Sequence, residues 1–74
     1  MNKQEIKSKI EEILEIPDTS LDTPIREFLL DSLEILEAVL RIEDSLEINV
    51  VLNFKLQTYN DFVELVYNSY LTKG

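Results

Sequence analysis

The apolar residues of the chain recur with a helical period in three stretches. Near the N-terminus, a spacing of i, i+4, i+7 and i+8 places four of them on one face of a helix: Ile6, Ile10, Ile13 and Leu14. Asn2 and Glu5 have the spacing of a capping box at the start of this helix, and Pro17 marks its end. The pattern therefore predicts a first helix between Asn2 and Pro17.

Residues 16–30 predict a long loop, because they hold both prolines together with Asp, Thr and Ser. Apolar side chains recur along it and would not remain in water; they are Leu21, Ile25, Phe28, Leu29 and Leu30. We therefore expect a packed loop and not a flexible linker, and a loop of this length in a compact domain is usually functional.

A second helix is predicted from Asp31 to about Leu46. The Asp31 carboxylate suits an N-cap, and Glu34 completes a D-x-x-E capping box. At about 100° per residue, one side of this helix gathers a core-facing set: Ile35, Ala38, Val39, Ile42 and Leu46. Leu33, Leu36 and Leu40 widen the apolar arc to roughly 220°, beyond the roughly 100° that a core stripe needs. These three leucines are either covered by the long loop or offered to a partner.

Residues 48–57 alternate apolar and polar positions like a strand, but a lone strand has nothing to pair with. We therefore expect a loop and a short helix there. Thr58 and Asp61 predict the cap of a last helix, whose apolar stripe is Phe62, Leu65, Val66 and Tyr70. The chain is thus predicted to be all-α, with three main helices, a short third helix and a long first loop.

Length and charge narrow the class of protein. With 74 residues the chain can form one modest core, so residues 1–74 are interpreted as a single domain. Its 15 acidic and 7 basic residues give a net charge of -8, which disfavours nucleic acid and anionic membranes and favours basic protein surfaces. No signal segment or membrane span is apparent, so we expect a cytoplasmic monomer.

The residue types that ordinary catalysis needs are missing. The chain has no Cys and no His, and therefore no thiolate nucleophile, no thiolate metal site and no usual general base near neutral pH. No D-x-D-x-D-G calcium loop occurs either. We therefore expect neither an enzyme active site nor a metal site.

Acidic residues concentrate in residues 31–47, where Arg41 is the one base. A solvated helix face would explain them, but like charges three or four residues apart on a helix cost a few tenths of a kcal/mol each. A helix that keeps them favours a basic partner. The expected partner-binding residues are Glu34, Leu36, Glu37, Leu40, Glu43, Asp44 and Glu47.

Ser32 directly follows the predicted N-cap Asp31. Unsatisfied N–H groups and a partial positive charge at a helix N-terminus would stabilise a phosphate attached there. Asp-Ser is also simply a good helix start, so position alone leaves both interpretations open. Because no His or Cys can activate Ser32, another protein would have to act on it. The same DSLEI pentapeptide recurs at residues 44–48, which we interpret as coincidence since a thirteen-residue period is too short for a structural repeat.

The stretch DTPIREFLLDSLEILEAVLRIEDSLEI resembles the central region of acyl carrier proteins, in which a loop leads into an Asp-Ser-Leu motif that opens an acidic second helix. The resemblance implies a four-helix bundle with a short third helix. It further implies that Ser32, flanked by Asp31 and Leu33, receives 4′-phosphopantetheine from coenzyme A through a phosphopantetheinyl transferase (a holo-acyl-carrier-protein synthase). The thiol of this arm would carry acyl or aminoacyl groups as thioesters between enzymes with basic docking patches, in fatty acid, polyketide or related biosynthesis.

This resemblance also accounts for the missing Cys and His, since the reactive sulfur comes with the cofactor. Two features depart from the family pattern: Leu29 stands where Gly is usual, and residues 49–56 are apolar where acidic residues are usual. They suggest a specialised free-standing carrier, and we expect Leu29 to pack beneath the loop. The alternative is a small acidic helical adaptor that binds a basic protein surface without a cofactor. The Asp31-Ser32 helix start favours the carrier, because an adaptor has no need of it.

Overall fold

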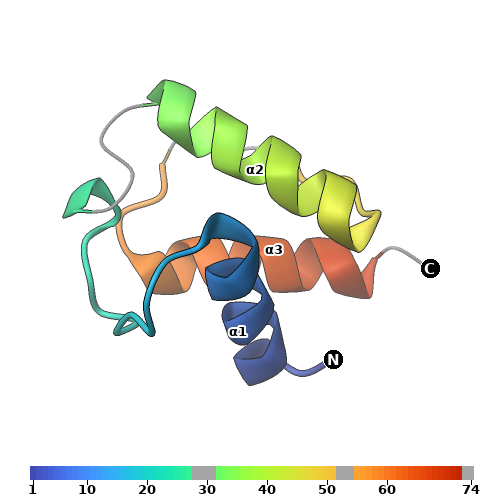
Figure 1. Ribbon diagram of the computed structural model, residues 1–74, viewed down its shortest axis with the longest axis horizontal. Coiled ribbons are helices and arrows are strands. Elements are labelled where there is room, and N and C mark those ends of the chain that lie inside the picture. Colours follow the sequence, from blue (N-terminus) through green and yellow to red (C-terminus); the bar gives the residue numbers. More distant parts are fainter. Residues whose placement is uncertain (28–31, 52–54, 73–74) are drawn as a thin grey trace.

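The computed structural model of the chain, in which residues 1–27, 32–51 and 55–72 are described, contains three α-helices joined by two long connections (Figure 1). The helices are α1 (Lys3–Leu14), α2 (Ser32–Leu46) and α3 (Tyr59–Leu71). A short 3₁₀ helix, η1 (Ile25–Glu27), interrupts the first connection. The predicted all-α class is confirmed, since the described residues contain no strand beyond an isolated bridge between Pro24 and Thr58.

Both predicted N-terminal capping boxes that fall on described residues are confirmed. The Asn2 side chain accepts a hydrogen bond from the Glu5 N–H at 2.9 Å, and the Glu5 carboxylate accepts one from the Asn2 N–H at 3.1 Å. Thr58 and Asp61 make the same reciprocal pair at the start of α3. These contacts satisfy N–H groups that have no partner within the helix, and so they fix where each helix begins.

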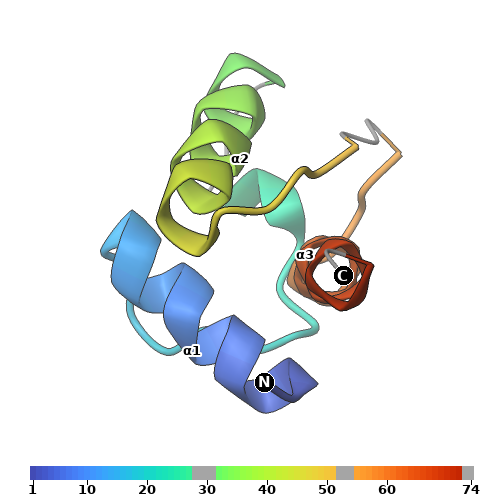
Figure 2. The ribbon, with the colours of Figure 1, turned by 90° about the vertical axis from the view of Figure 1, so that its right-hand side faces the viewer.

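The core lies between the three helices, which Figure 2 shows with α3 seen end-on and α1 and α2 to one side of it. The predicted inward faces of α1, α2 and α3 supply most of it. Its buried apolar residues are Ile6, Ile10, Ile25, Ala38, Val39, Ile42, Ile48, Val50, Tyr59, Phe62, Val63 and Val66. Ile13, Leu14, Ile35, Leu46, Leu65 and Tyr70 from the same predicted stripes are partly buried against this core.

The short third helix expected within residues 48–57 is not found in the described parts of this segment, 48–51 and 55–57, while residues 52–54 lie outside the described residues. Three α-helices are therefore described where a four-helix bundle was expected. The strand-like alternation has a different cause: Ile48 and Val50 point into the core, whereas Val51 is 83% exposed. The Glu43 carboxylate accepts a hydrogen bond from the Val50 N–H at 2.7 Å, so a side chain takes the bond that a neighbouring strand would otherwise accept.

The first connection is anchored to the rest of the protein, as its apolar residues predicted. Ile25 is buried and Leu21 is partly buried against the core. The predicted roles of Phe28, Leu29, Leu30 and Asp31, including the packing of Leu29 and the capping box of Asp31 with Glu34, fall outside the described residues. Among the described residues, no helix has both the length and the apolar character that crossing a bilayer requires.

Candidate functional site

The helix start predicted beside Ser32 is confirmed, because Ser32 is the first residue of α2. The first turn of an α-helix has N–H groups without intrahelical partners and carries the positive end of the helix dipole. The neighbouring Leu33 is 63% exposed. A phosphate attached at this end of α2 would lie in the favourable field of the helix dipole.

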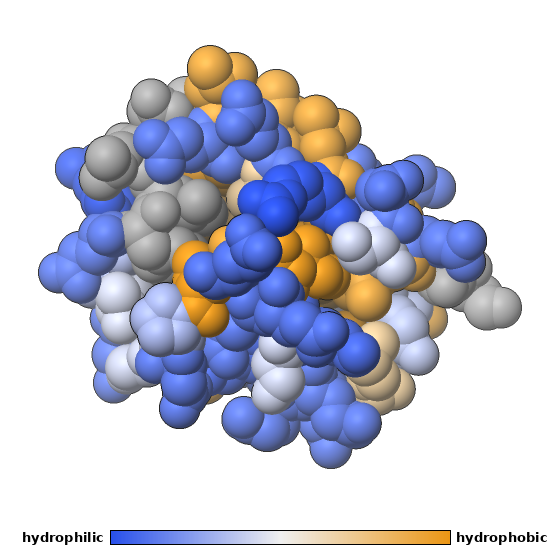
Figure 3. All heavy atoms as spheres, in the orientation of Figure 1, coloured by the Kyte–Doolittle hydropathy of each residue, from blue (hydrophilic) through white to orange (hydrophobic). Residues whose placement is uncertain are grey.

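The three outer leucines of α2 are exposed to solvent. Leu33 is 63% exposed, Leu36 40% and Leu40 54%, so the described part of the long connection does not cover them. Figure 3 shows hydrophobic surface along the upper edge of the molecule, where α2 lies in Figure 1. Of the two alternatives for these leucines, cover by the described part of the loop is therefore not found.

The acidic residues of α2 share this outward side. Around the helix axis Leu33, Leu36, Glu37, Leu40 and Asp44 fall within an arc of roughly 100°, and all five are exposed, as is Glu47 directly after the helix. We call these six residues the outer face of α2. Glu34 and Glu43 lie at its edges and are partly buried.

Arg41, the one base of α2, lies beside this acidic surface, about 40° beyond Glu37 around the helix axis. Its Nη2 donates a hydrogen bond to the Ile13 carbonyl at the C-terminal end of α1, at 2.9 Å. A cation is favourable at that end of a helix. Arg41 and Glu37 are four residues apart, but the ion pairs of the described residues do not include this pair.

Glu43 has a structural contact that the sequence did not predict. Its carboxylate holds the backbone of the connection after α2 through the Val50 N–H, and Glu47 beside it adopts a left-handed backbone with φ of 55°. The Ile48 N–H then donates to the Glu43 carbonyl at 3.2 Å, which closes the C-terminal turn of α2. Glu43 therefore has a role in the fold, whereas Glu37 and Asp44 are exposed.

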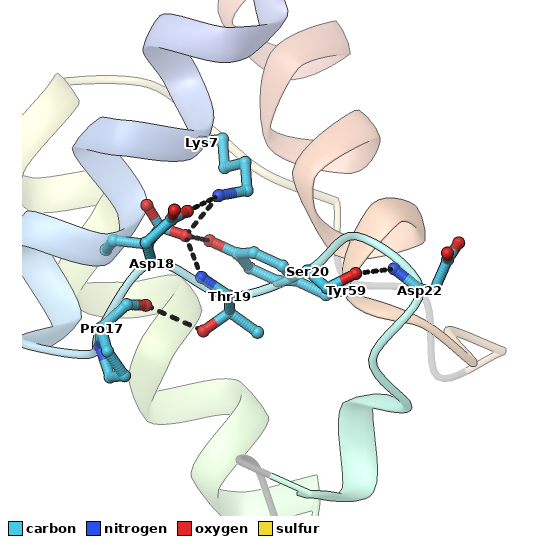
Figure 4. A network of polar contacts seen from close by, with 8 residues as sticks. Lys7, Pro17, Asp18, Thr19, Ser20, Asp22 and Tyr59 are labelled. Atoms are coloured by element: carbon cyan, nitrogen blue, oxygen red, sulfur yellow. Dashed lines mark hydrogen bonds and ion pairs between the residues drawn. The ribbon is translucent and has the colours of Figure 1, made fainter.

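A buried polar network, which the sequence did not predict, joins α1, the first connection and α3 (Figure 4). The buried Lys7 ammonium pairs with Glu11 and Asp18 and lies 5.7 Å from the centre of the Tyr59 ring. Burial alone would lower the pKa of Lys7, but its hydrogen bonds to Asp18 and Glu11 raise it. Burial and the neighbouring Glu11 also raise the pKa of Tyr59. The i, i+4 spacing of Lys7 and Glu11 is the one signal in the sequence that points to this network.

A family model described as a phosphopantetheine attachment site matches residues 4–66, from the first turn of α1 into α3. The chain belongs to this family. Its members carry 4′-phosphopantetheine covalently, so the cofactor expected from the sequence is confirmed and the chain is a phosphopantetheine carrier. No curated protein sequence and no solved structure matches the chain.

Membership of this family changes the weight of the two functional hypotheses. Carrier domains are modified by phosphopantetheinyl transferases and serve acyl-handling enzymes, and they are not themselves catalytic. An adaptor without a cofactor would have no reason to match a phosphopantetheine attachment model. The start of α2 at Ser32 lies inside the residues that the family model matches.

Proposed function

We propose that Ser32 is the attachment residue, and that the chain is a free-standing carrier of acyl or aminoacyl groups in fatty acid, polyketide or related biosynthesis. The observation that carries the proposal is the position of Ser32 as the first residue of α2, inside the matched region and next to the exposed Leu33. Asp31 and Leu33 would flank the attached group.

The chemistry of attachment follows from the groups involved. A new P–O bond forms to the Ser32 hydroxyl, the pyrophosphate P–O bond of coenzyme A breaks, and adenosine 3′,5′-bisphosphate leaves. The hydroxyl proton must pass to a base, and the absence of His from this chain assigns that base to the transferase. Once bound, the group supplies a thiol that forms thioesters. The contribution of this chain is the helix start, where the positive end of the helix dipole would stabilise the phosphodiester anion.

We also propose that the outer face of α2 is the surface that partner enzymes bind, with Glu34 and Glu43 at its edges. Exposed acids steer a basic partner toward the helix and mainly raise the association rate. Leu33, Leu36 and Leu40 then supply apolar contact between these acids. Apolar contacts at the centre of an interface act mainly on the dissociation rate.

Intact-mass spectrometry after incubation with coenzyme A and a phosphopantetheinyl transferase tests the attachment residue. We expect one added phosphopantetheine on the unmodified chain and none on Ser32→Ala. Ser45→Ala is the matched control, because Ser45 lies in the second DSLEI copy and in the same helix; it should load normally. Persistent loading of Ser32→Ala would refute the assignment, and failure of the parent chain to load with several transferases would favour the adaptor.

A further inference from the structure

The buried network places a single carboxylate oxygen at the meeting point of three elements. Glu11 Oε2, in α1, accepts hydrogen bonds from the Lys7 Nζ at 2.8 Å, from the Thr19 N–H at 3.0 Å and from the Tyr59 hydroxyl at 3.1 Å. Thr19 belongs to the first connection and Tyr59 is the first residue of α3. Figure 4 shows the Lys7 ammonium, the Thr19 backbone and the Tyr59 hydroxyl lying close together. The beginning of the connection is therefore held against α1 and α3 together.

A second set of bonds holds the next part of the same connection. The first N–H groups of α3 donate to it: Tyr59 N–H to the Thr23 carbonyl at 2.8 Å and Asn60 N–H to the Leu21 carbonyl at 2.9 Å. The Ile25 N–H donates in turn to the Gln57 carbonyl at 2.9 Å. These α3 groups are among those that a helix leaves without intrahelical partners, so the connection replaces water as their acceptor.

Tyr59 takes part in both sets, through its hydroxyl and through its backbone N–H. The segment that it fixes continues directly into η1 (Ile25–Glu27), which the Glu27 N–H closes onto the Pro24 carbonyl at 3.0 Å. Only residues 28–31 separate η1 from Ser32. The C-terminal half of α2 has its own ties, from Arg41 to α1 and from Glu43 to Val50.

We propose that Glu11 and Tyr59 are positioning residues for the Ser32 end of α2. They fix the path of the first connection as far as η1, and since only four residues then separate η1 from Ser32, this limits how far the first turn of α2 can move or fray. The consequence for loading rests on the proposed function of Ser32, whereas the consequence for the order of α2 does not. A residue that acts only by stabilising the core would affect every part of the molecule alike.

Amide hydrogen exchange on the unloaded protein tests the positioning role. Tyr59→Phe keeps the ring and removes the hydroxyl bond to Glu11. We expect exchange of the Thr19 N–H to rise about three- to tenfold, as loss of one hydrogen bond implies. We also expect faster exchange of the Leu36 N–H, which in an α-helix pairs with the Ser32 carbonyl. Val66→Ala is the matched control, because Val66 is fully buried in α3 and takes no part in the bonds that Glu11 and Tyr59 make to the first connection. It should speed only the amides that exchange by global unfolding.

The outcome at Leu36 decides the proposal. Faster exchange at Thr19 and Leu36 in Tyr59→Phe, but not in Val66→Ala, supports it. Unchanged exchange at Leu36 overturns it, because the bonds of Glu11 and Tyr59 would then order only the first connection and not the start of α2. Equal changes at Leu36 in both variants also overturn it, since they would show a general loss of stability.

Loading kinetics of Glu11→Gln give a second, separable measurement. If the start of α2 is in its competent position for a smaller fraction of the time, the transferase KM for the carrier rises by that factor while kcat is retained. We expect KM to increase at least about twofold with kcat unchanged. A fall in kcat with unchanged KM would contradict the positioning role. Absence of loading in the parent chain would count against Ser32 itself, and the exchange experiment would still decide the role of Tyr59.

Discussion

The pair α1 and α3 and the helix α2 use their polar and charged side chains differently. In α1 and α3, capping boxes fix both helix starts, and Lys3, Lys7 and Glu11 bond across to other elements. In α2, Arg41 and Glu43 also bond to other elements, but Glu37 and Asp44 are exposed beside three exposed leucines. The difference indicates that α2, besides its contacts with the core, presents a surface whose exposed apolar and acidic residues contribute little to stability, whereas the polar residues of α1 and α3 mainly hold the fold.

This division of roles suits a chain of 74 residues, because a chain this short can form only one modest core. A helix that presents a binding surface must keep apolar side chains in water, and it therefore stabilises the fold less than a helix buried on that side. The core side of α2 compensates with Ala38, Val39 and Ile42, all of them buried. Each helix can therefore be tested by substitutions whose effects should separate stability from recognition.

The largest expected contrast is between apolar truncations in α3 and α2. Phe62→Ala removes a fully buried ring and should lower the free energy of unfolding by about 3–5 kcal/mol, a large part of the total for a small domain. Leu40→Ala, on the outer face of α2, should change it by less than about 0.5 kcal/mol. Chemical denaturation measures both. A loss of more than about 2 kcal/mol for Leu40→Ala would mean that the outer face is part of the folded core.

Charge reversal on α2 should give the opposite contrast, because it should change the association rate with a partner and not the free energy of unfolding. Glu37→Lys or Asp44→Lys should slow association with a basic partner enzyme roughly two- to tenfold and flatten its salt dependence. The reason is that exposed charges act over a Debye length near 8 Å at physiological salt. Stopped-flow association rates with the transferase at several salt concentrations measure this. Glu12→Lys, an exposed site in α1, is the control; if it slows association as much as Glu37→Lys, net charge and not the α2 surface governs binding.

We expect a smaller change in thermal stability when one acid is neutralised in each region, Asp61 in α3 or Asp44 in α2. Backbone N–H groups of Gln57 and Thr58 hold the pKa of Asp61 below its usual value, so the charged carboxylate stabilises the folded state. Because the folded pKa is lowered, this contribution is present above the unfolded pKa of about 3.9 and is lost as pH falls through the folded value.

Thermal unfolding as a function of pH measures this contribution. Asp61→Asn should lower Tm at pH 7, and its curve should approach that of the parent chain below about pH 4. Asp44→Asn, which removes an exposed acid of α2, should not lower Tm at pH 7. A constant difference between Asp61→Asn and the parent across the whole pH range would show that the capping carboxylate does not act through its charge.

The features that the sequence predicted well are those set by near neighbours. The Asn2–Glu5 and Thr58–Asp61 boxes join residues three apart, and helical periodicity alone places Ile10 and Phe62 in the core. The start of α2 at Ser32 followed from the same local rules. This is why the candidate attachment residue could be singled out before its surroundings were known.

The features that the sequence did not predict depend on contacts between distant residues. Tyr59 bonds to Glu11 across 48 positions, and Arg41 bonds to the Ile13 carbonyl in another helix. The segment after α2 has the alternating apolar pattern of a strand because Ile48 and Val50 both face the core. This pattern does not require a partner strand. A helix was expected there because local pattern cannot show that a Glu43 carboxylate would pair with the backbone.

The claim that α1 and α3 mainly hold the fold while α2 presents the binding surface is tested most directly by mapping where the transferase binds. Backbone amide spectra of the isotopically labelled chain, recorded with and without the unlabelled transferase, report on each helix separately. The account predicts that signal changes concentrate in α2 from Leu33 to Glu47, while the outward amides of α1 and α3 are unaffected. Changes centred on α1 or α3, with α2 unaffected, would contradict it.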